Sequence, residues 1–360
     1  MKNLNLVATL FFGVAVVFSS CKKDDLPEIV LPIAPTGNEV VSANISSDTR
    51  WTADRVYQLG GRITVLSGAT LTIDPGVIIK GEAGTGSNAT ALIIARGGRI
   101  MAEGTADKPI IFTSVADEIS ISDINAGNFA SPNLDPDVNG LWGGVIVLGR
   151  SPISASNSSG DVNEIQIEGI PTSDSNGLYG GNDAADNSGT LKYISIRHGG
   201  SNIGNGNEIN GLTLGGVGSG TVIENIEIVG NQDDGIEWFG GSVNVTNVVV
   251  WNCGDDGIDT DQSWSGTLDN FVVIGVTGHS FELDGPEGTF AAGHTIRNGS
   301  IKASYNGRVS EDLINVDDNS IVNLSNLYFT DIMDGNKINR VTAAGVSFSS
   351  ITLNVPTDSL

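Results

Sequence analysis

The chain has little cysteine and little positive charge. Its 360 residues contain two cysteines, too few for a disulfide framework, so a large apolar core must supply the stability. Lysine and arginine number 18 against 42 aspartates and glutamates, which gives a formal net charge of −24. A surface of this sign repels nucleic acids and anionic membranes and favours cations or neutral ligands. We therefore expect no nucleic-acid partner.

Several sequence motifs are absent as well. There is no GxxxxGK[ST] phosphate loop, no GxGxxG after a strand, no HExxH, no zinc-type cysteine spacing and no GxSxG nucleophile elbow. No segment has the periodicity of a convincing amphipathic helix. Glycine is abundant, at 48 residues, which indicates many turns. A hydrophobic content of 39% with 17% charged residues is not typical of a disordered chain.

The first residues predict export. Lys2 precedes an apolar run at residues 6–18, and small residues then lead to Cys21. This run is too short to cross a bilayer core of about 30 Å, so we interpret residues 1–20 as a signal peptide. The site resembles the bacterial lipobox, which implies that Cys21 is lipidated. The charged residues 22–25 resemble the export signal of Bacteroidota surface lipoproteins, which implies an outer-membrane protein that faces the cell exterior.

The remaining chain predicts a repeat of strands. Residues 21–45 contain prolines and no sustained periodicity, which is typical of a tether. From residue 46 to 360 short β-rich segments alternate with Gly, Asn and Asp turns. Ile236, Ile258 and Phe281 recur after 22 and 23 residues, about one coil of three short strands. This spacing favours an all-β, single-stranded right-handed parallel β-helix of about ten coils over a sandwich or a barrel.

Asparagines recur in the same frame. The series has spacings of 22, 23, 28 and 28 residues and consists of Asn225, Asn247, Asn270, Asn298 and Asn326. Asparagine tolerates the left-handed backbone of a strand-entry bend. Stacked amides can also bond to one another from coil to coil. We therefore expect a buried asparagine ladder.

Segments of the first half resemble the opening coils of bacterial surface proteins with a pectin-lyase-like β-helix. They are residues 67–81 (SGATLTIDPGVIIKG), 104–114 (GTADKPIIFTS), 141–149 (LWGGVIVLG) and 189–198 (GTLKYISIRH). The resemblance extends over roughly residues 50–350 and implies the fold. It implies little about activity, because one fold hosts many functions.

Acidic residues also recur in coil register, and we name them the acidic strip. The series consists of Asp233, Asp234, Glu237, Asp255, Asp256, Asp259, Asp261, Glu282 and Asp284. Stacking brings like charges within about 5 Å of one another, so a cation, a raised pKa or full solvation must relieve them. Calcium prefers such oxygen ligands. We take as candidate ligands Asp233, Glu237, Asp255, Asp259, Asp261 and Glu282.

An enzymatic alternative also rests on a resemblance. The order of acidic and basic residues is similar to that of polygalacturonase active sites, which implies catalytic roles for Asp234, Asp255, Asp256, His279, Arg297 and Lys302. Paired carboxylates can serve as general acid and base in glycoside hydrolysis. The sequence departs from that pattern, because it lacks the Asn-Thr-Asp motif and the compact Arg-x-Lys arrangement, and Ser280 follows His279 where the family has glycine.

Three tryptophans fall near the acidic strip. Trp238, Trp251 and Trp264 are candidates for stacking on sugar rings, although such residues more often cover loops or core edges. We interpret the chain as an outer-membrane-anchored surface lipoprotein that acts as a binding or structural module. Its expected partner is a polysaccharide or an outer-membrane protein, with calcium as a candidate ion. The alternative is a polysaccharide hydrolase or lyase.

Overall fold

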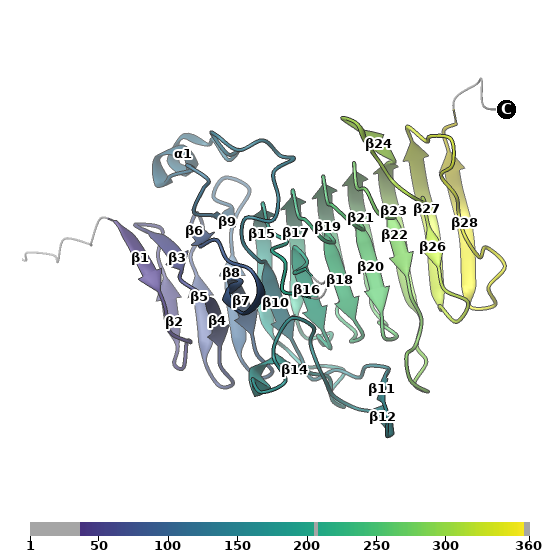
Figure 1. Cartoon of the computed structure of the whole chain (residues 1–360), viewed down its shortest axis with the longest axis horizontal. Coiled ribbons are helices and arrows are strands. Elements are labelled where there is room, and N and C mark those ends of the chain that lie inside the picture. Colours follow the sequence, from purple (N-terminus) through teal and green to yellow (C-terminus); the bar gives the residue numbers. More distant parts are fainter. Residues whose placement is uncertain (1–36, 205–207, 356–360) are drawn as a thin grey trace, which may run out of the picture. The chain divides into compact units, whose positions relative to one another are not determined.

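The computed structural model describes residues 37–204 and 208–355, and these residues form stacked parallel coils (Figure 1). A 14-stranded sheet, the long sheet, runs along one side of the coils. Its strands are β1 (Asn38–Val41), β2 (Thr49–Trp51), β3 (Val56–Leu59), β5 (Thr70–Ile73), β6 (Ile78–Gly81), β8 (Arg99–Glu103), β9 (Ile110–Ser114), β15 (Gly189–Arg197), β17 (Val222–Val229), β19 (Val245–Trp251), β21 (Thr267–Ile274), β23 (His294–Lys302), β27 (Val322–Thr330) and β28 (Val346–Leu353).

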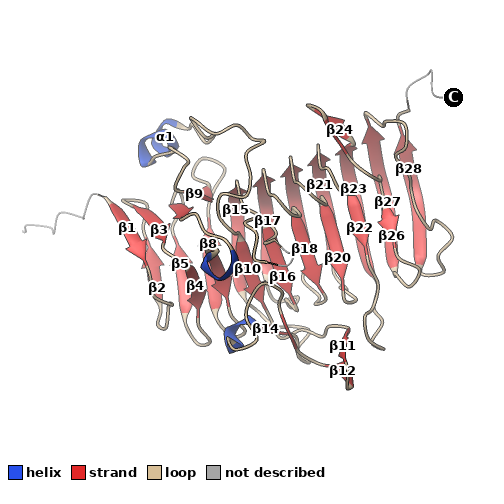
Figure 2. Ribbon diagram, in the orientation of Figure 1, coloured by secondary structure: helices blue, strands red, loops and turns tan. Residues whose placement is uncertain are grey.

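An eight-stranded sheet, the short sheet, forms the other side. Its strands are β4 (Arg62–Val65), β7 (Ala91–Ile94), β10 (Val145–Leu148), β16 (Leu212–Gly215), β18 (Ile236–Phe239), β20 (Ile258–Asp261), β22 (Phe281–Leu283) and β26 (Asn315–Val316). Antiparallel hairpins and short helices occur outside the two sheets (Figure 2). They are η1 (Gly86–Asn88), α1 (Ile121–Ala126), β11 (Ala155–Asn157), β12 (Gly160–Val162), β13 (Ile165–Gln166), η2 (Ser175–Gly177), β14 (Leu178–Tyr179), β24 (Ser304–Tyr305) and β25 (Arg308–Val309).

The long strands bend at one left-handed residue. The first part of β15 pairs with β8 and its last part pairs with β9, and Tyr193 between them has a φ of 50°. Asn225, Asn247 and Asn270 occupy the same position in the next coils, with φ values of 58° to 62°. Each coil therefore contains three strand segments, two joined by this bend and one in the short sheet. The predicted parallel β-helix is confirmed.

The predicted register is confirmed as well. Ile236 pairs with Ile258, and Ile258 pairs with Phe281, at the spacing of one coil. These three side chains are fully buried and belong to one core that extends through the stacked coils. Because each coil places an apolar residue above the last one, the core is continuous, and burial of apolar surface contributes about 25 cal/mol per Å².

Two insertions leave the coils and cover their outer faces. The first, residues 115–144, carries α1, and its Ile119 and Ile124 pack against Ile78 and Ile111 of the long sheet. The second, residues 149–188, carries both β11–β12 and β13–β14, and it covers the outer side of β7 and β10. The two insertions therefore shield apolar residues on the outer faces of both sheets.

The predicted leader and most of the predicted tether, including Cys21, lie outside the described residues. Within the range assigned to the tether, β1 pairs with β3, and Ile45 bridges to Val65. The long sheet therefore begins inside that range. Among the described residues, no helix has the length and apolar character needed to cross a membrane.

Candidate functional site

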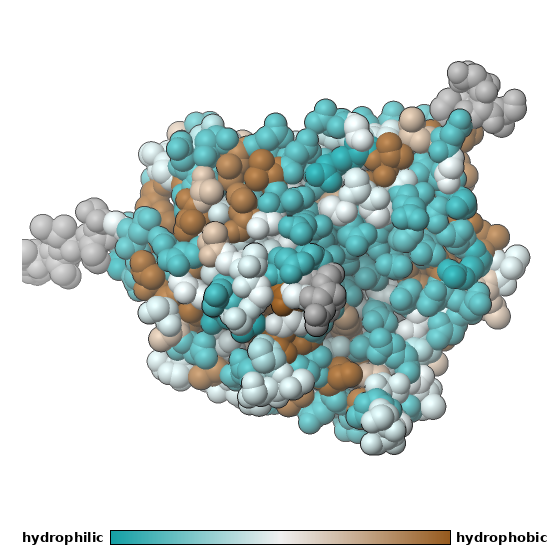
Figure 3. Space-filling view, in the orientation of Figure 1, coloured by the Kyte–Doolittle hydropathy of each residue, from teal (hydrophilic) through white to brown (hydrophobic). Residues whose placement is uncertain are grey.

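The acidic strip lies on the outer face of the short sheet. Glu237 pairs with Asp259, and Asp259 pairs with Glu282, as the 22-residue period predicts. The outward row continues to Asn315 on β26, and on the other side Thr213 pairs with Glu237. Figure 3 shows hydrophilic side chains gathered over this face, to the right of its centre, where the surface is hollowed. Sequence reasoning missed Asn315, because it lies 33 residues after Glu282 and so departs from the 22- and 23-residue spacings of the preceding coils.

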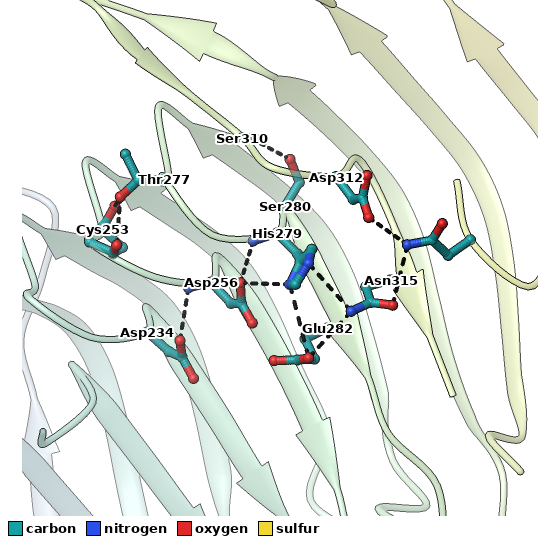
Figure 4. Close-up of polar contacts among 12 residues, drawn as sticks. Asp234, Cys253, Asp256, Thr277, His279, Ser280, Glu282, Ser310, Asp312 and Asn315 are labelled. Atoms are coloured by element: carbon teal, nitrogen blue, oxygen red, sulfur yellow. Dashed lines mark hydrogen bonds and ion pairs between the residues drawn. The ribbon is translucent and has the colours of Figure 1, made fainter. Parts of the chain in front are cut away.

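The turn before each strand adds a second row of acidic residues. Asp234 accepts a hydrogen bond from the backbone N–H of Asp256 at 2.8 Å, and Asp256 accepts one from the backbone N–H of His279 (Figure 4). Both carboxylates are almost fully buried. Gly278 permits this approach, because a Cβ there would collide with the carboxylates of Asp255 and Asp256. One oxygen each of Asp234 and Asp256 is therefore used to join successive coils.

The most tightly packed group combines the two rows. Asp234, Glu237 and Asp259 have carboxylate oxygens within 4.8 Å of one another. Burial, followed by the neighbouring carboxylates, raises the pKa of each of the three well above its ordinary value. The charged groups around Asp259 are all acidic. No lysine or arginine among the described residues forms an ion pair with the group. Only protons or an added cation can relieve the repulsion among these three carboxylates.

Asn210 is a further member that sequence reasoning missed. Its side-chain N–H donates to Glu237, and its own carbonyl oxygen Oδ1 is buried without a hydrogen-bond partner among the described residues. An unpaired buried carbonyl is costly, and such an oxygen is a good ligand for a hard cation. A coil-periodic signal marks this position, because Asn210-Gly211-Leu212 aligns with Asp234-Gly235-Ile236 and Asp256-Gly257-Ile258 at spacings of 24 and 22 residues.

The adjacent group of Asp256, His279 and Glu282 differs because it contains a basic side chain. The Nδ1 of His279 lies 3.2 Å from Asp256 Oδ1 and 3.9 Å from Glu282 Oε1, and its Nε2 lies 3.3 Å from the Asn315 amide. The contact with Asp256 raises the pKa of His279 to about 9, so the imidazole is protonated at neutral pH. Burial raises the pKa of Glu282 to about 9. Here the protein supplies its own cation, and an added metal ion is not needed.

The remaining candidate ligands flank these two groups. Asp233 and Asp255 lie with Asp234 in a third set of oxygens within 4.8 Å, and burial raises the pKa of Asp233 to about 7. Burial also raises the pKa of Asp261 to about 8, with the charge of Glu287 as the next cause. The acidic strip is therefore continuous, and the all-oxygen groups around Asp234 fit a calcium ion better than the histidine group does.

The structure separates two residues of the enzymatic alternative from the strip. Arg297 and Lys302 lie on β23 of the long sheet, whereas the acidic strip follows the short sheet. Arg297 pairs with Asp269 at 2.8 Å, and Lys302 lies 3.8 Å from Asp331. The predicted grouping of Asp234, Asp255, Asp256 and His279 with these two cations is therefore wrong, because a single coil places its strands on different faces.

Two of the three tryptophans are not surface residues. Trp238 is 0% and Trp264 is 1% exposed, and their rings stack on each other inside the coils at 4.6 Å. The expected role in ligand stacking is wrong for both. Neighbouring strand residues point to opposite faces, so Trp238 points inward because Glu237 points outward. Trp251 is partly exposed, but it lies on the long sheet, away from the acidic strip.

The comparisons with known proteins agree with this architecture. The family model described as pectate-lyase like beta helix domain matches residues 43–127 and 129–357. The chain therefore belongs to the pectate-lyase-like β-helix domain family. No curated protein and no solved structure shows a significant match.

Proposed function

We propose that this protein is a lipid-anchored surface protein of the outer membrane that binds a polysaccharide through its acidic strip with the help of calcium. Lipid on Cys21 would hold it to the membrane, and the coils would present the short sheet to the exterior. The family supports a carbohydrate-related role. The leader and the charged residues after Cys21 support the location.

One observation carries the choice of site. Glu237 and Asp259 stack in register beside Asp234 with no basic residue in the group. A calcium ion bound there would neutralise the repulsion, and its open coordination positions would accept sugar hydroxyl or carboxylate oxygens. An acidic surface alone repels polyuronates, so a bridging cation also accounts for the binding of an acidic polysaccharide.

A hydrolase or lyase is the second candidate, and the raised pKa values of the buried carboxylates favour it, because a general acid must stay protonated at working pH. Two observations weigh against it. Asp234 and Asp256 are almost fully buried and bonded to the next coil's backbone. The expected basic partners lie on the other sheet.

A paired screen tests the site. The mature protein is applied to a glycan array with calcium and with chelator, and the same polysaccharides are assayed for cleavage. We expect calcium-dependent binding and no cleavage. Glu237→Gln with Asp259→Asn should abolish binding, whereas Asp107→Asn, which removes a charge from an exposed turn, should not. Calcium-independent binding would contradict the cation, and cleavage lost in the double variant would favour the enzyme.

The location has its own test. Cys21→Ser should release the protein from the membrane fraction, because the lipidated thiol is removed. External protease should degrade the wild-type protein on intact cells. Membrane partitioning that is the same for variant and wild type would contradict the anchor. Protection from external protease would contradict the surface orientation.

A further inference from the structure

A cavity of about 270 Å³ lies on the long sheet, beneath the first insertion. Phe129, Leu134 and Pro136 line it from the insertion, and Arg197, Glu227 and Trp251 line it from the sheet. The acidic strip lies on the short sheet, so the cavity is a separate site. The volume is just below the range of about 300–1,000 Å³ that is typical of sites for drug-sized molecules. It suits a single ring.

The walls of the cavity are held in place by Arg197. This side chain is almost fully buried, and it donates to the backbone carbonyl of Phe129, to Glu227 Oε2 at 3.1 Å and to Ser195 Oγ at 2.6 Å. The insertion is also tied down by Asp137, which lies 3.4 Å from Arg308 and 3.1 Å from Asn306. The site is therefore built before any ligand arrives, which reduces the entropy cost of binding.

One polar side chain of the cavity wall is open and keeps an oxygen without a hydrogen-bond partner among the described residues. Ser195 and Arg197 both contact Glu227 Oε2, and Oε1 is left as an acceptor on a side chain that is 42% exposed. His198 Nε2 and Trp251 Nε1 also lack partners, but both atoms are buried within the wall. Glu227 is therefore a polar group of the wall that a ligand can reach.

We infer that this cavity is a subsite for one neutral sugar ring. A sugar has an apolar C–H face, which fits the indole of Trp251 and the ring of Phe129, and hydroxyl groups at its edge, which can donate to Glu227 Oε1. The guanidinium of Arg197 is already bonded to Ser195, Phe129 and Glu227, and the free oxygen of Glu227 repels anions, so a neutral sugar is favoured over a uronate. The inference shares the ligand class of the proposed function but not its site.

Tryptophan fluorescence tests the subsite directly. Of the five tryptophans, Trp51, Trp142, Trp238 and Trp264 are at most 2% exposed, so acrylamide quenching reports mainly on Trp251. The probes are the methyl glycosides of glucose, galactose and mannose, with methyl galacturonide as the acidic counterpart. We expect at least one neutral glycoside to protect Trp251 from quenching, and the galacturonide to fail. No protection at about ten times a 1 mM Kd would overturn the inference.

Two variants separate this site from the acidic strip. Glu227→Gln leaves the reporter in place and should weaken protection about tenfold or more. Asp259→Asn should leave protection unchanged while it weakens the calcium response. Equal protection in wild type and Glu227→Gln would overturn the subsite, and so would its loss in Asp259→Asn. A failed array screen with intact protection of Trp251 would reject the proposed function and retain this subsite.

Discussion

Two rows of stacked polar residues cross the coils, and they differ in how each residue meets its neighbour. On the long sheet, Asn247 donates to Asn225 at 3.0 Å and accepts from Asn270 at 2.7 Å. On the short sheet, Asp259 stacks on Glu237 among other carboxylates. An amide is both donor and acceptor, so a stack of amides is self-complementary. A carboxylate only accepts, so a stack of carboxylates needs protons or a cation.

The exposure of the two rows is the opposite of what their charges favour. The asparagine ladder was expected to be buried, yet Asn247, Asn270 and Asn298 are exposed, so that expectation is wrong. Asn298 also breaks the ladder, because it donates to Asp269 at 2.6 Å instead of to Asn270. Asp234 and Glu237, by contrast, are buried. The self-complementary row lies in water, and the repelling row is partly buried, which is the more costly arrangement.

The largest expected effect is on the pH dependence of the metal-free protein. The folded protein raises the pKa of Asp233 to about 7, of Asp261 to about 8 and of Glu282 to about 9. Each group binds its proton more tightly when folded, so its stabilising contribution is complete below about pH 4 and is lost as the pH rises through these values. Melting in chelator should show stability falling from about pH 4 to about pH 9. A flat profile over that range would contradict the burial of these charges.

The next effect is the response to calcium. At 100 times its Kd, calcium should stabilise the wild-type protein by about 2.7 kcal/mol, and Glu237→Gln with Asp259→Asn should remove most of this gain. In chelator at pH 8 the double variant should melt no lower than the wild type, because like-charge repulsion has been removed. Asp107→Asn is the charge-matched control. A double variant that retains the full calcium response would place the ion elsewhere.

A smaller effect is expected in the asparagine ladder. Asn247→Ala removes the bonds to Asn225 and Asn270 and places alanine at a φ of 59°, so we expect a loss of about 1–2 kcal/mol. Asn247→Gly relieves the backbone strain but not the lost bonds, so it should recover about half of that loss. Chemical denaturation measures both variants. If the alanine and glycine variants lose the same free energy of unfolding, backbone strain does not contribute to the loss.

The smallest effect is expected at the exposed pair of Arg297 and Asp269. Arg297 is 49% exposed, so Arg297→Ala should cost about 0.2–1 kcal/mol and should leave the calcium response and any polysaccharide binding unchanged. Denaturation and the array measure both properties. A loss of binding much larger than the loss of stability would return Arg297 to the functional site.

Much of this arrangement could be predicted because a parallel stack repeats its neighbours. The 22- and 23-residue spacings placed Ile236, Ile258 and Phe281 in the core and Glu237, Asp259 and Glu282 in one row. Two errors had a usable signal. Alternation along β18 places Trp238 opposite Glu237, and Arg297 directly precedes Asn298, which places it on the long sheet. No signal in the sequence indicated that Asp234 and Glu237 of the acidic row are buried.

The repeat in the amino-acid sequence specifies the coil, its register and the two polar rows, because each depends on residues one period apart that must pack directly above one another. Where the two insertions fold, and which outer faces they cover, depends on tertiary contacts that the repeat does not specify. The first insertion thereby closes the cavity of Phe129 and Trp251. These contacts join loops to coils at separations that no period relates, so no repeat in the sequence records them.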